Sequence, residues 1–427
     1  MDIRGKRLLI LGGQQKLCDI VTRAKELGVY CIVTDWYENS PAKKIADKSF
    51  QISTSDVDAI LELIKAEKID GVLTGYIDST LPYYCEICKK ANLPCYLNES
   101  VLHVCTNKRN FKDACKAVGI KTIREVDINK PKSFEFPILI KPVDNSGSKG
   151  ITVCSDETMV RPAYERALRF SKSKSVIIEK FMDCDYVCAH YIVTDGKAEL
   201  AMLMDKDMNR IGRGTVPYPT AFVSPSKYYE SFLETEHPLI QEFVRSIGYN
   251  NGTFLISFFV NGNNYYAIEL SARLTATREY IFINDSLGID TLEMYIRHSL
   301  TGVFACDKEI YRGREACYCM LFTFLNNGII GKIEGMDSVL AMSGVLDVLQ
   351  LRDVGATIRA DGSYGQLFSR IHLKAEEAAE MRELINEVED SIQVYSEEGK
   401  PMVIAGFDAD RFFSWYKYRG NKTAQLL

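Results

Sequence analysis

The chain has 427 residues, of which 46% are hydrophobic and 26% charged, values that are ordinary for globular proteins. Its net charge of −5 reflects no excess of Lys and Arg, so neither DNA nor RNA is expected as a partner. The length suggests about two to four domains of roughly 100 to 200 residues each.

The sequence contains no apolar stretch as long as a membrane span, and it begins with a strand pattern rather than a signal peptide. We therefore expect a cytoplasmic protein that makes no membrane contact. The 13 cysteines are scattered, which favours reduced thiols. Cys85 and Cys88 form a CxxC pair, but no second pair follows at metal-site spacing, so ordinary thiols are favoured there.

The first hundred residues alternate strand and helix patterns. The expected strands and helices are, in chain order, 7–11, 14–27, 29–34, 57–67, 70–74 and 79–91. Repeated units of strand and helix predict a parallel sheet.

Asp35, at the end of the second expected strand, is typical of a dinucleotide site. The turn after the first strand lacks the GxGxxG pattern, however, because Gly12 and Gly13 are followed by Gln, Gln and Lys. Substrate binding near Gly12 and Asp78 and a purely structural turn both stay open.

A helix is expected from Thr106, a good N-cap, to Gly119, with Phe111 and Cys115 on its apolar face. Lys108 lies in the first turn of this helix, where a positive charge opposes the helix dipole. An anionic ligand would explain the lysine, and a solvated side chain is the alternative.

The segment FPILIKPVDNSGSKG combines a strand, Lys141 and a loop of small residues. Gly147 and Gly150, with Ser146 and Ser148, allow backbone N–H groups to converge on phosphate oxygens, and Lys149 adds charge. The spacing is not that of a P-loop, and a simple turn is the alternative.

The run VIIEKFMDCDY, residues 176–186, reads as a buried strand followed by Glu179, Lys180 and Phe181. A strand that leads into such a segment can offer an apolar slot and backbone groups to an adenine ring. An acid soon after it, such as Asp185, can accept ribose hydroxyls. Any edge strand could have the same pattern.

The run YYAIELSARLTATR places Glu269 at the end of an apolar strand, with Ser271 and Arg273 after it. Such an arrangement can present a carboxylate to a metal beside a cation that holds an oxyanion. Upstream, residues 204–226 are rich in Gly, Pro and polar side chains and read as a long loop. Lys206 in this loop is a candidate for contact with phosphates or a substrate acid, against the alternative of a solvated surface.

The order of these segments resembles the ATP-grasp superfamily of carboxylate-amine ligases, with most similarity to the L-amino acid ligase, carbamoyl phosphate synthetase and glycinamide ribonucleotide synthetase branches. The resemblance implies a multidomain protein of the α/β and α+β classes. It implies a Rossmann-like domain at 1–105, an ATP-grasp domain at 106–308 with a lid at about 118–185, and an α+β closing domain at 309–427.

By this resemblance Lys108 and Lys141 contact the nucleotide, and the loop 146–150 closes over the triphosphate. Glu179, Lys180 and Phe181 match the segment that reads adenine, and Asp185 lies near the ribose acid, although Cys184 replaces the usual glycine.

The metal site departs from the family pattern. Glu269 is retained, but Ser257 and Ser271 stand where two further ligands are usual. One carboxylate with two serines can still hold Mg²⁺ or Mn²⁺, with one ion expected rather than two. Arg273 matches the residue that holds the oxyanion or the incoming carboxylate. Arg278 is a second candidate for that role, against a salt bridge with Glu279 or Asp285.

The resemblance implies an enzyme that uses ATP to activate a small carboxylate as an acyl phosphate and then couples it to an amine. One alternative is a purine-pathway or carboxyphosphate-forming enzyme, and another is an ATP-binding regulator with a degenerate metal site. The sequence does not fix the oligomeric state, and a homodimer stays open.

Overall fold

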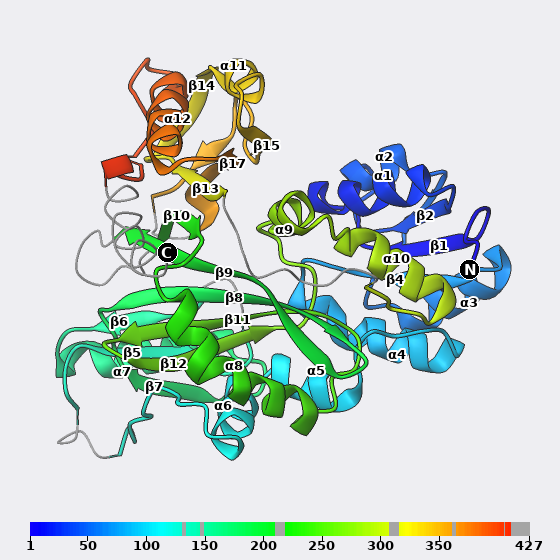
Figure 1. Ribbon diagram of the computed structural model, residues 1–427, viewed down its shortest axis with the longest axis horizontal. Helices are drawn as coiled ribbons and strands as arrows, with labels where there is room; N and C mark the ends of the chain where they lie inside the picture. Colours follow the sequence, from blue (N-terminus) through cyan, green and yellow to red (C-terminus); the bar gives the residue numbers. More distant parts are fainter. Residues whose placement is uncertain are drawn as a thin grey trace, which may run out of the picture.

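A computed structural model describes residues 1–129, 134–145, 149–209, 218–306, 316–360, 364–404 and 406–410. Its strands form four sheets, and Figure 1 shows the first part of the chain on one side of the long central strands, with the C-terminal part above them. Across these ranges, no helix has both the length and the apolar character that a membrane crossing requires.

The first part of the chain forms a four-stranded sheet in the order β3-β2-β1-β4. Its elements are β1 (Arg7–Leu11), η1 (Gln15–Leu17), α1 (Cys18–Glu26), β2 (Tyr30–Thr34), α2 (Pro41–Ile45), β3 (Lys48–Phe50), α3 (Val57–Glu67), β4 (Gly71–Leu73), η2 (Asp78–Thr80) and α4 (Leu81–Ala91). All three strand pairs are parallel, which confirms the sheet predicted from the repeated strand and helix units. The helix expected from residue 14 starts later, after a short 3-10 turn.

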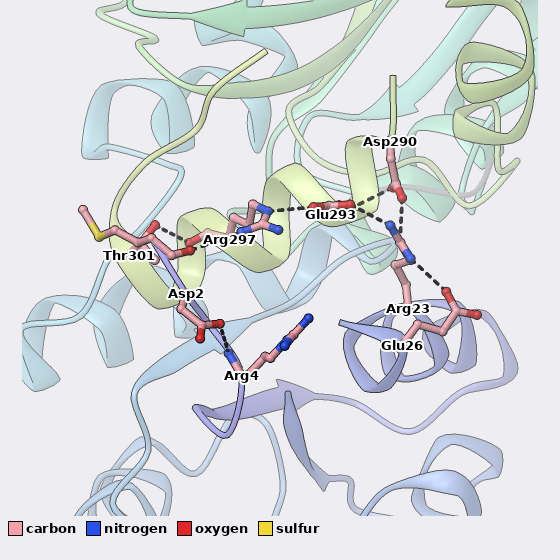
Figure 2. Close-up of polar contacts among 9 residues, drawn as sticks. Asp2, Arg4, Arg23, Glu26, Asp290, Glu293, Arg297 and Thr301 are labelled. Atoms are coloured by element: carbon pink, nitrogen blue, oxygen red, sulfur yellow. Dashed lines mark hydrogen bonds and ion pairs between the residues drawn. The ribbon is translucent and has the colours of Figure 1, made fainter. Parts of the chain in front are cut away.

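A helix from much later in the chain completes this first layer. Helix α10 (Thr291–Thr301) lies among the blue elements of Figure 1, and a Cβ at Gly71 in β4 would come within 2.1 Å of the Ser299 carbonyl oxygen. Glycine at that position therefore permits the helix backbone to approach the strand closely. Arg23 of α1 contacts Asp290 and Glu293 at the start of α10, each at 2.6 Å. Figure 2 shows these contacts as dashed lines.

Two helices and a small sheet follow. They are α5 (Glu99–Cys105), α6 (Lys108–Ala117), β5 (Ile138–Pro142), β6 (Thr152–Cys154), η4 (Glu157–Met159), α7 (Val160–Phe170) and β7 (Val176–Lys180). The N-cap of α6 is Asn107 rather than the predicted Thr106, because the Asn107 side chain accepts from the N–H groups of Arg109 and Asn110. The predicted apolar face is confirmed by the burial of Phe111 and Cys115.

The small sheet has the antiparallel order β6-β5-β7 and its own hydrophobic cluster, which includes Ile138, Ile140 and Ile178. This cluster is separate from the main core. Because its core is separate, the small sheet can be positioned as one rigid unit relative to the rest of the chain.

The largest sheet has eight strands in the order β12-β11-β8-β9-β10-β13-β17-β15. Its elements, with the helices between them, are β8 (Asp185–Thr194), β9 (Lys197–Asn209), β10 (Tyr218–Ser224), α8 (Tyr229–Ser246), β11 (Gly252–Asn261), β12 (Asn264–Ser271), α9 (Tyr280–Leu287), β13 (Cys317–Phe324), β15 (Val345–Gln350) and β17 (Leu367–Ala375). The prediction of a loop over 204–226 was wrong at both ends, since β9 extends to Asn209 and β10 begins at Tyr218. Both strands bury most of their side chains in the sheet. This burial favours a strand there in spite of the polar residues that indicated a loop.

The C-terminal part adds α11 (Met336–Leu340), η5 (Tyr364–Gln366), α12 (Ala378–Ser391) and a small sheet of β14 (Gly328–Glu334), β16 (Thr357–Ile358) and β18 (Gln393–Ser396). A second hydrophobic cluster joins α12 to the strands of this part, for example through Ile371, Ile385 and Val394. Strands β13, β15 and β17 nevertheless belong to the large sheet, so the C-terminal part is continuous with the central strands.

Candidate functional site

One large cavity, of about 970 Å³, lies where these parts meet. Eleven of the residues predicted for the site line it: Lys108, Lys141, Lys149, Glu179, Lys180, Phe181, Lys206, Ser257, Glu269, Ser271 and Arg273. The structure therefore brings together side chains that are up to 165 positions apart in the sequence, since 273 minus 108 is 165.

Of the remaining predicted residues, those that the structure describes lie outside the cavity lining. Gly150 has a positive φ of 80° but does not line the cavity. Asp185 is also outside the lining, and its carboxylate accepts from the Tyr228 hydroxyl and pairs with Lys227 at 2.7 Å. Asp183, two residues earlier, does line the cavity. Ser146, Gly147 and Ser148 fall outside the described residues.

Arg278 also lies away from the cavity lining. Its guanidinium contacts Asp19 of α1 at 2.8 Å and Asp347 of β15 at 2.5 Å. The structure thus shows Arg278 in salt bridges, which was the alternative to binding a substrate carboxylate. Its partners are Asp19 and Asp347 rather than the expected Glu279 or Asp285.

Strand β5 and helix α6 position the two lysines expected at the nucleotide. The Lys108 backbone N–H donates to Val143 O at 3.0 Å, and its ammonium donates to Asn145 O at 2.5 Å. Burial, followed by the positive charge of Lys141, lowers the pKa of Lys108, while the charge of Glu269 opposes this shift. The two lysines and Glu269 therefore share one electrostatic environment, which suits a ligand with several negative charges.

Glu179 is buried beneath these lysines. Its carboxylate contacts Lys112 at 2.7 Å and Lys141 at 2.6 Å. Burial alone would raise the pKa of Glu179, but the charges of Lys141 and Lys112 outweigh burial and the pKa is lowered. The carboxylate thus fixes the Lys141 ammonium, and the neighbouring Lys180 points outward to Glu135 at 2.9 Å.

The large sheet supplies the floor of the cavity. Ser257 and Glu269 are directly opposite each other on β11 and β12, and Cys188 of β8 is the partner of Ser257 on its other side. A bulge at Ile268 interrupts the β11–β12 pairing, so Ile268 and Glu269 both line the cavity. The Lys206 ammonium lies 4.2 Å from the Tyr186 ring centroid, where a cation–π contact helps to offset its burial.

The donors around Glu269 fit one magnesium ion. Within the described ranges there is no group of three or more His, Cys, Asp or Glu side chains suited to hold a metal. Glu269 instead offers one carboxylate beside the hydroxyls of Ser257 and Ser271. Mg²⁺ in nucleotide sites commonly uses one or two carboxylates and completes its shell with phosphates and water.

At the far side of Glu269, Arg273 forms a bidentate pair with Asp78 of η2, with N–O distances of 2.6 and 2.7 Å. Asp78 follows β4 in the first sheet, so the pair joins that sheet to the end of β12. The expectation of substrate binding near Asp78 is consistent with its place in the cavity lining.

Sequence reasoning missed two cations of this cavity, Lys16 in η1 and Arg370 in β17. The sequence contained an indication for Lys16, because it follows the glycine turn at the carboxyl end of β1. Ligands tend to bind at that edge of an α/β sheet. The sequence also contained an indication for Arg370, because a charged residue within the apolar run LFSRIHL is unusual for a core strand.

Residues 107–300 match the family model described as "Carbamoyl-phosphate synthase L chain, ATP binding domain". A formate-dependent phosphoribosylglycinamide formyltransferase of Prochlorococcus marinus (strain MIT 9515) is 25% identical over 303 residues, which cover 68% of this chain and 75% of the relative.

Solved structures share the fold over most of the chain. An L-amino acid ligase from Bacillus licheniformis matches with a TM-score of 0.77 at 18% identity, covering 92% of this chain and 99% of the ligase. The biotin carboxylase domain of 2-oxoglutarate carboxylase from Hydrogenobacter thermophilus, solved with MgADP, ADP and bicarbonate, matches with a TM-score of 0.74 at 16% identity and covers 93% and 91%. The family match over 107–300 and the shared fold confirm the predicted resemblance: residues 107–300 are similar to an ATP-binding domain, and most of the chain shares its fold with ATP-dependent ligases and carboxylases.

Proposed function

We propose that the protein is an ATP-dependent ligase that activates a carboxylate as an acyl phosphate and couples it to an amine, with ADP and phosphate as products. One observation carries this proposal: a single cavity is lined by Lys108 and Lys141, by Glu269 and by the Asp78–Arg273 pair. Nucleotide phosphates and a small acid can therefore occupy one continuous space.

The first step is an in-line attack of a carboxylate oxygen on the γ-phosphorus of ATP. The new P–O bond forms as the bond from the γ-phosphorus to the bridging oxygen breaks, and ADP leaves. Lys108 and Lys141 supply positive charge to the phosphate oxygens, and the Glu179 carboxylate keeps Lys141 in place. A magnesium ion held by Glu269, Ser257 and Ser271 would add charge neutralisation when bound.

In the second step the amine nitrogen attacks the acyl carbon, phosphate leaves, and the nitrogen gives up a proton. Arg273 is held by Asp78 and lines the cavity, so its remaining N–H groups can donate to the oxygen of the tetrahedral intermediate. The guanidinium is therefore positioned before the substrate arrives, which avoids reorganisation during the reaction.

The adenine would lie between the small sheet and the segment after β7. Ile123, Leu139, Val153, Phe181 and Met182 line this end of the cavity. Such an apolar slot suits the faces of a purine ring. Asp183 takes the place proposed for the ribose acid, since Asp185 is engaged with Lys227 and Tyr228.

The test is ADP release from ATP and Mg²⁺ in the presence of a matrix of carboxylic acids and amines. We expect release to require an acid, and added hydroxylamine to trap the acyl phosphate as a hydroxamate without any amine substrate. If ATP binds but no acid stimulates ADP release, the ligase proposal is wrong.

Such an outcome would favour a second candidate, an ATP-binding protein without turnover. The observation behind it is that Glu269 is accompanied by Ser257 and Ser271 rather than by further carboxylates or amides. A purine-pathway or carboxyphosphate-forming ligase would instead respond to a phosphorylated amine or to bicarbonate in the same assay.

The proposed division into 1–105, 106–308 with a lid at about 118–185, and 309–427 is supported by the first parallel sheet and by the separate core of the small sheet. Helix α10 is the exception, because it packs on β4 although it belongs to the middle segment.

A further inference from the structure

Two positive side chains enter the cavity from opposite ends of the chain. Lys16 comes from η1, directly after β1, and Arg370 comes from β17 in the C-terminal part. All three of Lys16, Arg273 and Arg370 line this one cavity, and the charges of Arg370 and Arg273 act on Lys16. Of the three, Arg273 is neutralised by Asp78.

Arg370 is buried, and no carboxylate among the described residues lies at contact distance from its guanidinium. Only 5% of it is exposed, its Nη1 donates to Ala276 O at 2.6 Å, and its guanidinium carbon lies 5.8 Å from the Phe322 ring centroid. Its Nε is buried without a hydrogen-bond partner among the described residues. Burial lowers the pKa of Arg370, and the more distant charges of Tyr364 and Glu279 oppose this shift without cancelling it. A buried charge in this state is costly unless something pairs with it.

Lys16 is in a similar position. Among the residues described, no acid lies within ion-pair distance of its ammonium. Burial, and then the charges of Arg370 and Arg273, lower its pKa to about 8. Two cations without acids are thus held near each other in a partly buried space, and an anion placed there would relieve both repulsion and desolvation.

The place of these cations separates them from the nucleotide. Lys108 responds to the charges of Lys141, Glu269 and Asp78, whereas Lys16 responds to those of Arg370 and Arg273. The Asp78–Arg273 pair acts on both groups of cations, Asp78 on Lys108 and Arg273 on Lys16. An anion bound by Lys16 and Arg370 is then a group other than the phosphates held at Lys108 and Lys141.

We propose that Lys16 and Arg370 form an oxyanion clamp, and that a substrate of this enzyme carries a carboxylate or phosphate group besides the group that reacts. The substrate class is thus a dicarboxylic acid, an amino acid or phosphorylated amine, or a compound of the same charge pattern. This proposal rests on the ligase function proposed above. Because the clamp joins the two ends of the chain, the anion also links the first sheet to the C-terminal strands.

Binding of two probes tests the clamp without turnover. With ADP and Mg²⁺ saturating, inorganic phosphate and succinate are titrated calorimetrically into the full-length protein, and the better probe identifies the type of oxyanion. We expect Lys16→Met and Arg370→Met to weaken that probe at least tenfold, with ADP affinity unchanged. Equal affinity in wild type and both variants would overturn the proposal.

Two control variants and one conservative substitution are measured beside Lys16→Met and Arg370→Met. Lys89→Met and Arg161→Met remove cations that are 76% and 90% exposed and lie outside the cavity, and both should bind the probe as wild type does. Arg370→Lys keeps the charge if Arg370→Met fails to fold, and it should retain part of the affinity. A loss of affinity in the controls equal to that in Lys16→Met would reject a specific clamp.

Proton uptake gives a second readout. At pH 8 an anion should raise the fraction of protonated Lys16, so titrations in two buffers of different ionisation heat should show proton uptake that Lys16→Met lacks. Uptake of the same size in Lys16→Met would also overturn the proposal.

The two proposals fail in different ways. If no acid stimulates ADP release, the ligase function is wrong, whatever the anion titrations give. If an acid or an amine that carries a further carboxylate or phosphate reacts with the same KM in wild type and Lys16→Met, the clamp is wrong and the ligase function stands.

Discussion

Glu269 is the side chain on which the metal assignment depends. It is exposed to the cavity on β12, so Glu269→Ala should leave the fold intact. We expect kcat to fall about a hundredfold or more, because the phosphates lose the ion that offsets their charge. The measurement is ADP release as a function of Mg²⁺ concentration, with thermal unfolding as the control. Turnover equal to that of wild type would remove Glu269 from the site.

Lys16 gives a prediction about stability and pH. Its pKa is about 8 in the folded protein and 10.5 in the reference state, so between these values the unfolded chain holds a proton that the folded chain lacks. Stability without a bound anion should therefore rise as the pH increases from about 8 toward 10. Below about pH 8 both states are protonated and the full repulsion remains.

The difference between wild type and Lys16→Met isolates this effect from other titrating groups. Unfolding midpoints of both proteins from pH 7 to 10 should converge at the alkaline end, with the variant at least as stable as wild type near pH 7. A variant that is less stable at pH 7 would show that Lys16 stabilises the fold.

Helix α6 positions Lys108, and its start depends on one residue. The Asn107 side chain accepts from two backbone N–H groups of the first turn, so Asn107→Ala should cost about 1 kcal/mol of stability. The first turn would fray and Lys108 would lose its fixed position, which should raise KM for ATP. Asn107→Asp restores the acceptor and should restore both properties, as measured by chemical unfolding and initial rates. A normal KM for ATP in Asn107→Ala would show that the cap does not position Lys108.

Elements with a strong local pattern were predictable from sequence. The bounds expected at 7–11 and 57–67 match β1 and α3, and Glu269 was placed at the end of the correct strand. The stretch 204–226 was misjudged because its Gly, Pro and polar residues indicated a loop, whereas its two acids, Asp205 and Asp207, are accommodated within the sheet. In the structure both are buried, and the Ser226 and Thr220 hydroxyls donate to them.

Contacts between distant elements left no local pattern. Arg278 pairs with Asp19, and Arg370 lines the same cavity as Lys16, and in both cases the two residues lie more than 250 positions apart. Periodicity and capping rules describe residues that are close in sequence. They could therefore identify these side chains as unusual charged residues, but not their partners.

At the scale of the whole molecule, Arg278 connects three parts of the chain. It has a φ of 64°, contacts Asp19 in α1 and Asp347 in β15, and Asp347 also lies 3.4 Å from His372 Nδ1. Arg278→Met would leave two partly buried carboxylates without their cation, which should destabilise the protein by about 3 kcal/mol. Chemical unfolding measures this loss, and Arg297→Met, which removes a cation of the α10 surface, is the control. Equal losses in both variants would show that the network adds nothing specific.

The large sheet has a consequence for the size of the substrate. The order β12-β11-β8-β9-β10-β13-β17 places six steps between the strand of Glu269 and the strand of Arg370, about 29 Å in a flat sheet. Both residues line one cavity, so the sheet must curl, and bulges in the β11–β12, β8–β9, β9–β10 and β13–β17 pairs provide the local bends. The distance across the site, from the strand of Glu269 to the strand of Arg370, is therefore set by several small bends distributed over the whole sheet. Substrate length can change through substitutions at a bulge in β9 or β10 that touch no ligand atom.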